Sequence, residues 1–178
     1  MALIAESITT FYDKQEDRLS LIFNGNGKDN KQLMGLMTRQ FFKSLLAQLP
    51  NWLTQQRTDS MPHTAEQQWA INQIYHQVSQ QKITAAYGQI QPNKQLRTFL
   101  INTVNLTKGN LEGGDQKIRL EFLDLNKTIE IIFVLNSAQL HKFMGEILKQ
   151  VQAWDIDNPW QDKDMTAVSS DTKDRVMH

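Results

Sequence analysis

The fold is decided by the stretch from Lys117 to Trp154, which reads KIRLEFLDLN-KTIEIIFVL-NSAQLHKFMGEILKQVQAW. The first segment alternates apolar and polar residues, which is the pattern of a half-buried strand. The second segment is rich in β-branched residues, which favours a buried strand, and Asn126 lies at the turn between the two. Asn136 or Ser137 can cap the third segment, whose apolar residues recur every three and four positions. The stretch therefore predicts a strand, a tight turn, a strand and an amphipathic helix.

A weaker copy of this pattern lies near the N-terminus. RLSLIFN, from Arg18 to Asn24, alternates like a strand, and two Asn-Gly pairs and a second candidate strand follow it. Thr38 can then cap a helix with a broad apolar stripe, which Pro50 should end or kink. We therefore predict two repeated hairpin-plus-helix units, at about residues 18–53 and 117–154, that share one antiparallel sheet.

Between the two units the sequence predicts a helix and a long strand. Residues 64–81 carry apolar side chains at helical spacing among many Gln and Asn residues, so we expect a third helix there, whose apolar face consists of Trp69, Ile71, Ile74, Tyr75 and Val78. From Gln95 to Thr107 both alternating sets of positions include apolar residues, which is typical of a central strand covered on both faces. The predicted fold class is α+β. It comprises one domain over residues 1–154, with a helix after each hairpin and the third helix inserted between them.

The character of the chain changes after Trp154. Residues 155–178 contain six Asp against two Lys and one Arg and show almost no apolar periodicity, so we expect a disordered acidic tail. Trp160 is a large apolar residue within this tail. Either it folds back onto the body of the protein, or it anchors the tail in a protein partner.

Charge and composition narrow the classes of function. Lys and Arg together number 19, as do Asp and Glu, so no net field draws the protein to nucleic acid or to an anionic membrane. The sequence has no Cys, which excludes disulfides, thiolate nucleophiles and thiolate metal ligands. It has neither a signal-peptide pattern at its start nor an apolar run of about 18 residues, the length that a membrane helix requires. We therefore expect a cytoplasmic protein without a membrane partner.

No motif of catalysis or cofactor binding accompanies these elements. Four His residues occur, but none has a second His or a carboxylate at a spacing typical of metal sites. There is also no G-x-S-x-G sequence or other nucleophile signature. We therefore predict no catalytic residues, no metal and no cofactor. Nucleic-acid binding would need a clustered basic face from residues such as Arg97 and Arg119, which the sequence does not indicate.

A few residues stand out as candidates for binding. Arg39 opens a helix directly after a strand, where free backbone N–H groups and a guanidinium would suit an anion. An ordinary helix cap with a solvent-facing Arg is the alternative. Trp69, Tyr75 and His76 would line a ligand pocket between the sheet and the inserted helix. Trp160 would contact a protein partner.

No motif specifies the function itself. We expect a non-enzymatic protein-binding or assembly protein, with a homodimer as its simplest form, that uses an uncovered sheet face or helix. The alternative is a small-molecule-binding protein or hydrolase, with a pocket in which a His meets a carboxylate.

Overall fold

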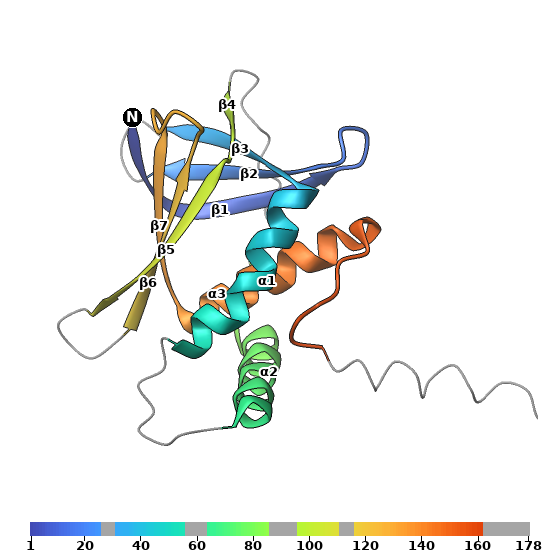
Figure 1. Ribbon diagram of the computed structural model, residues 1–178. Coiled ribbons are helices and arrows are strands. Elements are labelled where there is room, and N and C mark those ends of the chain that lie inside the picture. Colours follow the sequence, from blue (N-terminus) through green and yellow to red (C-terminus); the bar gives the residue numbers. More distant parts are fainter. Residues whose placement is uncertain (26–30, 56–63, 86–95, 111–115, 162–178) are drawn as a thin grey trace, which may run out of the picture.

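A computed structural model of the chain describes residues 1–25, 31–55, 64–85, 96–110 and 116–161 (Figure 1). Over these residues the chain forms seven strands and three α-helices. In chain order they are β1 (Ala2–Asp13), β2 (Arg18–Gly25), β3 (Gln32–Thr38), α1 (Arg39–Gln55), α2 (Ala65–Lys82), β4 (Arg97–Leu100), β5 (Thr103–Asn110), β6 (Gln116–Leu123), β7 (Glu130–Asn136) and α3 (Ser137–Gln150), followed by a short 3-10 turn, Gln152–Trp154. The predicted α+β class is confirmed.

The seven described strands form one sheet in the order β4-β3-β2-β1-β7-β6-β5. Strands joined by a hairpin are antiparallel, but β1 runs parallel to β7 and β3 runs parallel to β4. The prediction of a purely antiparallel sheet is therefore wrong. Both parallel pairs join segments that are separated by helices, and such crossovers leave no turn signal in the sequence. The internal repeat stays a prediction.

The predicted long strand is bent into β4 and β5, which lie at opposite ends of the strand order. At the bend the Ile101 N–H donates to the Leu36 carbonyl of β3, and the Asn102 N–H donates to the Leu123 carbonyl of β6. Both hydrogen bonds measure 2.9 Å. The sheet is thus curled until its two ends meet at this corner.

The bend also explains the misleading apolar pattern of this segment. Phe99 and Ile101 are buried in the core before the bend, whereas Val104 and Leu106 pack against the core after it. The inward-facing set therefore shifts by one position, and apolar residues occur at both alternating sets of positions although only one face is covered at a time. The prediction of a central strand covered on both faces is wrong.

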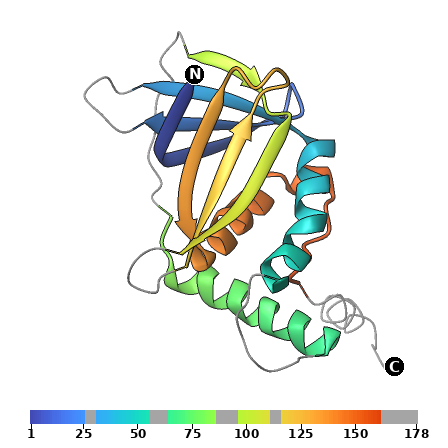
Figure 2. The same ribbon diagram turned by 60° about the vertical axis from the view of Figure 1, so that its left-hand side comes forward.

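The three helices gather on one side of the curled sheet (Figures 1 and 2). α1 continues past Pro50 to Gln55, and its buried residues are Phe42, Leu46, Leu49 and Leu53. α3 buries a similar row, which consists of Leu140, Met144 and Ile147, followed by Val151 just after the helix. Side chains of this kind contribute about 1.5–3 kcal/mol each when they are fully buried, so these two rows fasten α1 and α3 to the sheet.

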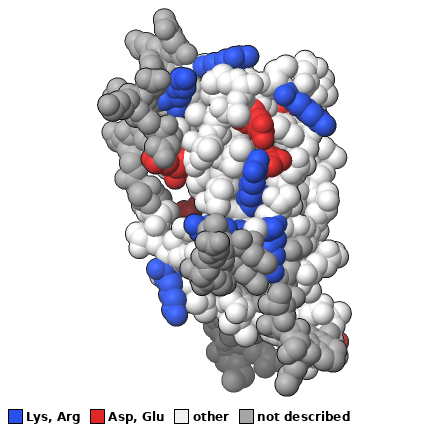
Figure 3. All heavy atoms as spheres, turned by 90° about the vertical axis from the view of Figure 1, so that its left-hand side faces the viewer, with Lys and Arg blue, Asp and Glu red and all other residues white. Residues whose placement is uncertain are grey.

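Figure 3 looks onto the side of the molecule where β6, β7 and the N-terminus lie, on the left in Figure 1. Basic side chains are spread over this side with acidic side chains among them, and they do not gather into one patch. Arg119 on β6, for example, pairs with Glu121 at 2.8 Å and with Glu130 at 3.5 Å. Within the described ranges, no helix combines the length and the apolar character needed to cross a membrane.

Candidate functional site

The orientation of α2 is the reverse of that of an ordinary surface helix. Its buried residues are polar, namely Asn72, His76 and Ser79, and we call them the inner row. A separate side carries the outer stripe, which consists of Ile74, Tyr75 and Val78 at 58%, 52% and 37% exposure. Each set recurs at helical spacing, so each occupies one side of the helix. A surface helix normally buries its apolar side, and α2 leaves that side in solvent.

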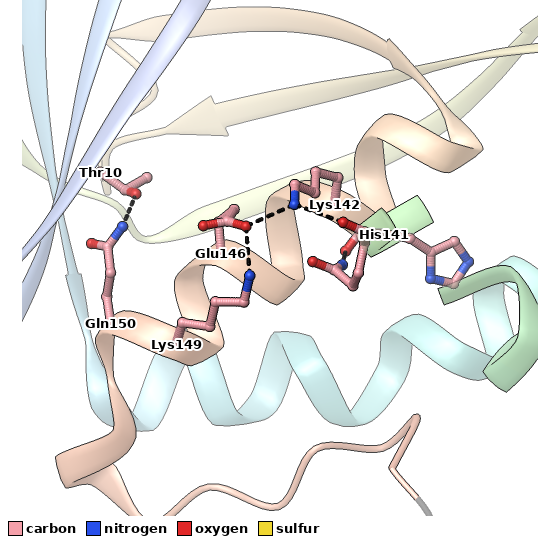
Figure 4. A network of polar contacts seen from close by, with 7 residues as sticks. Thr10, His141, Lys142, Glu146, Lys149 and Gln150 are labelled. Atoms are coloured by element: carbon pink, nitrogen blue, oxygen red, sulfur yellow. Dashed lines mark hydrogen bonds and ion pairs between the residues drawn. The ribbon is translucent and has the colours of Figure 1, made fainter. Parts of the chain in front are cut away.

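Polar groups hold α2 against its neighbours (Figure 4). The Gln80 amide donates to the His141 carbonyl of α3 at 2.8 Å, and the Lys142 ammonium donates back to the Gln80 carbonyl at 3.1 Å. On the α1 side, the Asn72 amide donates to the Thr54 hydroxyl at 2.7 Å. Hydrogen bonds of this kind contribute about 0.5–1.5 kcal/mol each. Together they anchor α2 without using its outer stripe.

Lys142 also belongs to a charge cluster on α3. Glu146 accepts from Lys142 at 3.0 Å and from Lys149 at 2.9 Å (Figure 4). Burial alone would raise the pKa of Glu146, but hydrogen bonds from the two ammonium groups lower it below its ordinary value. The carboxylate therefore stays ionised, and it positions Lys142 to hold the end of α2.

A stack of aromatic rings closes the interface between α2 and α3. The His76 ring lies flat on Trp160, with centroids 4.5 Å apart and planes 12° apart. The His141 ring stands edge-on to both, at 5.5 Å from His76 and 5.2 Å from Trp160. Burial, and then the nearby positive charge of Lys149, lower the pKa of His76 to about 4. Since its Nδ1 atom also has no hydrogen-bond partner among the described residues, His76 acts as a neutral packing ring and is poorly suited to act as a base.

Trp160 lies six residues beyond the expected end of the domain and is only 2% exposed. The backbone N–H of Trp160 donates to the Asn158 side chain at 3.0 Å, which shapes the turn that brings the indole back onto α2. Trp160 thus packs within its own chain, and its binding to a protein partner stays a prediction. The remainder of the predicted tail, residues 162–178, lies outside the described residues.

Two cavities flank the segment that carries Trp160. One of about 720 Å³ is lined by Trp69, by Lys43 of α1 and by residues 155–159 and 161. The other, of about 370 Å³, is lined by His76, Lys149 and other residues of α2, α3 and the C-terminal segment. Within the described ranges, no group of three or more His, Asp or Glu residues is placed to hold a metal ion.

The structure does not assemble the predicted ligand residues into one pocket. Trp69 and His76 line different cavities, and Tyr75 lies on the outer stripe. α2 packs on α3 and α1 and is not among the elements that cover the sheet directly. Arg39 is at the start of α1. Hydrogen bonds from Tyr12 and Trp154 lower the pKa of Asp17, and the charge of Arg39 adds to this effect. Anion binding by Arg39 stays a prediction.

The sequence contained one signal for the buried polar side that our prediction did not use. Asn72, His76 and Ser79 are four and three residues apart, so they share a helix face as clearly as the apolar residues do. Burial of apolar surface usually dominates packing, which favours the apolar residues for the interior. The choice between two stripes on one helix depends on what the neighbouring helices present, which is tertiary information.

The close approach of α2 to α3 depends on Gly145. A Cβ atom at this position would lie 2.2 Å from the Gln80 side-chain nitrogen, so a larger residue must displace Gln80 from its hydrogen bond. We expect Gly145→Leu to increase hydrogen exchange of the α2 amides at least about tenfold and to lower stability by about 1–3 kcal/mol. Gly109→Ala is the control, because its Cβ would meet nothing closer than 4.0 Å. If hydrogen exchange of the α2 amides were unchanged in Gly145→Leu, the close approach of α2 to α3 would not depend on Gly145.

We compared the chain with known proteins in three ways. A scan against protein-family models finds no match. Searches among curated proteins and among solved structures find no significant match either.

Proposed function

We propose that the protein is an assembly protein that binds a second copy of itself through the outer stripe of α2. The observation that supports this most directly is the exposure of Ile74 and Val78, at 58% and 37%, on a helix that buries its polar side instead. Leaving such side chains in water forgoes about 1 kcal/mol of burial energy for each of them. A partner with an apolar surface would recover this energy.

The outer stripe suits its own copy in shape. In a two-fold symmetric dimer the same surface meets itself, so a contact from one residue to another occurs twice. If two α2 helices cross antiparallel with the symmetry axis between Ile74 and Tyr75, these two residues meet across the axis. Ile71 then meets Val78 in the same way. The helix surface is therefore self-complementary from Ile71 to Val78.

The stripe also suits its own copy in charge. From Gln67 to Gln81, α2 contains no Lys, Arg, Asp or Glu, and its one His is buried and neutral. Two copies can therefore meet without like-charge repulsion. A partner with a strongly charged surface would gain nothing from this stripe and would lose hydration on contact.

The contact should be reversible. An α-helix of 18 residues is about 27 Å long, so a single pair of helices buries less than the roughly 800 Å² per partner of a standard stable interface. We therefore expect dissociation constants in the micromolar range, at which the monomer and the dimer coexist.

The mass of the full chain in solution tests this proposal. From about 1 µM to about 1 mM, light scattering after size-exclusion chromatography should show a rise from the monomer mass of 20.6 kDa toward twice that value. Ile74→Glu should stay monomeric at every concentration, because it places a charge in the stripe. Gln73→Glu is the matched control: at roughly 100° per residue it points away from Tyr75 and Val78, and it should dimerise like the unmodified protein. A monomer throughout, or a dimer that survives Ile74→Glu, would refute the proposal.

A further inference from the structure

Among the described residues, the outer edge of β5 has no paired strand. It is the last strand of the sheet order and pairs with β6 alone. From Thr103 to Thr107, no described residue hydrogen-bonds the β5 backbone on the side away from β6. Every second residue of such an edge presents a backbone N–H and a carbonyl outward, which is a template for a further strand.

An uncharged groove of about 520 Å³, lined by apolar side chains and by polar ones such as Gln48 and Asn51, runs beside this edge. α1 forms one wall with Phe41, Leu45 and Trp52, and β5 forms the other with Val104 and Leu106. These side chains are partly buried against the core, so the groove is a firm surface with its apolar side open to solvent. Its volume falls within the range of about 300–1,000 Å³ that is usual for binding sites. Figure 2 shows α1 and β5 on the same side of the molecule, and together they border the groove.

The walls of the groove are uncharged. The sequence has no Lys, Arg, Asp or Glu from Ser44 to Gln55 of α1, nor from Asn102 to Thr107 on the β5 side. A charged side chain that entered the groove would lose its hydration and find no opposite charge in these walls. The groove therefore matches an occupant whose inward-facing side chains are apolar and uncharged.

The position of α1 favours a single extended segment over a second copy of this chain. A strand that adds to β5 has β5 on one side and α1 on the other. If the incoming strand belonged to a folded sheet, its own neighbouring strand would have to occupy the space that α1 fills. An isolated segment has no such neighbour, and it can lie between β5 and α1.

We infer that the β5 edge and the α1 wall form a binding site for an extended segment of another protein with uncharged apolar side chains at alternate positions. The segment adds to the sheet as a strand next to β5. Main-chain hydrogen bonds to Thr103–Thr107 hold it, and every second side chain enters the groove. This site is separate from the outer stripe of α2, so it goes beyond self-association and can be tested independently of it.

The test uses the full chain and the peptide acetyl-Lys-Val-Thr-Leu-Thr-Val-Lys-amide, which has apolar residues at alternate positions. Binding is followed by calorimetry, and its position by hydrogen exchange of the β5 amides. Two N-methylated versions separate strand addition from simple apolar contact: one is methylated at Val and Leu, the other at Thr. Since only one set of peptide N–H groups faces β5, one version should lose at least about tenfold in affinity and the other should bind like the parent. A peptide with Asp in place of Val and Leu should not bind.

Protein variants locate the site. Leu45→Glu should weaken binding at least about tenfold because it puts a charge in the α1 wall. Lys43→Glu should not, because Lys43 lines the cavity on the other side of α1. The peptide variants leave the protein unchanged, so the result does not depend on the folding of Leu45→Glu. Slower exchange at 103–107 with the parent peptide supports the inference. Four results would overturn it: no binding up to about 1 mM peptide, equal binding of both methylated peptides, protection outside β5, or β5 protection that rises with protein concentration in the absence of peptide.

Discussion

Replacing Trp154 with Ala is expected to lower the free energy of unfolding by about 4 kcal/mol. The indole is completely buried and joins three parts of the fold. It stands edge-on to Tyr12 of β1 with ring centroids 5.5 Å apart, and it packs against Phe42 of α1 at 6.1 Å. Its N–H donates to the carboxylate of Asp17, which also accepts from the Tyr12 hydroxyl at 2.6 Å. Ala would leave a large cavity where the β1–β2 turn, α1 and the end of α3 meet.

Denaturant unfolding followed by circular dichroism measures this loss. For a chain of this size, a change of about 4 kcal/mol corresponds to a fall of roughly 10 °C in Tm. Trp154→Phe should lose less, because it keeps a ring in the cavity and gives up only the hydrogen bond and part of the volume. Trp69→Ala is the matched control: Trp69 is 40% exposed, and its loss should cost about 1 kcal/mol or less. If Trp154→Ala and Trp69→Ala lowered the free energy of unfolding equally, the contacts of Trp154 with β1 and α1 would not contribute the expected stability.

The elements that the sequence predicted well are those that bury one apolar face with a regular period. β3, β6, β7 and α3 have this character, and each lies within a few residues of its predicted range. β2 also lies close to its predicted range, although it buries residues on both faces. Their local pattern and their tertiary environment agree, so the pattern alone identifies them. The order of strands depends on which distant segments pair. For this reason the parallel contacts of β1 with β7 and of β3 with β4 were not foreseen.

The site was harder to predict because two stripes on α2 compete for the interior. If α2 covered the sheet, its apolar stripe would be buried. Instead, α1 and α3 already cover it, and what α3 offers to α2 is Lys142, the backbone carbonyl of His141 and the small residue Gly145. The polar groups of this surface form hydrogen bonds with polar groups of α2. The inner row of α2 therefore faces α3 and α1, and the outer stripe remains in solvent. The sequence also did not predict that β5 is an edge strand. β5 lies at the end of the sheet because the chain bends at Ile101 and Asn102.

Acid should destabilise the protein through His76 before most carboxylates are protonated. In the folded state burial lowers the pKa of His76 to about 4, whereas an exposed His in the unfolded chain titrates near 6.5. The unfolded state therefore binds the proton more readily, and the free energy of unfolding falls as the pH drops from about 6.5 to about 4. Above pH 6.5 the contribution of the neutral ring is fully present. The difference between the two pKa values limits the total loss to about 3 kcal/mol.

Other charged groups near His76 act differently over this range. Glu146 has a pKa below its ordinary value, which places its protonation at the acidic end of the range or below it. Asp17 and Asp124 also have lowered pKa values, because each accepts hydrogen bonds. These carboxylates destabilise the fold only at lower pH, after His76 has exerted most of its effect.

Comparing the unmodified protein with His76→Phe isolates the contribution of His76. Phe keeps a flat ring on Trp160 and cannot titrate, and no hydrogen bond at Nδ1 is lost. Between pH 7.5 and pH 4.5, denaturant titrations should show the unmodified protein losing about 2 kcal/mol more than the variant. Equal losses in the two proteins would mean that His76 is not held neutral by its burial between α2, α3 and Trp160. His76→Phe should lose less stability than the unmodified protein, and Trp160 of the variant should stay protected from solvent quenching at pH 4.5. Together these results would show that a neutral ring at position 76 keeps the C-terminal segment on α2.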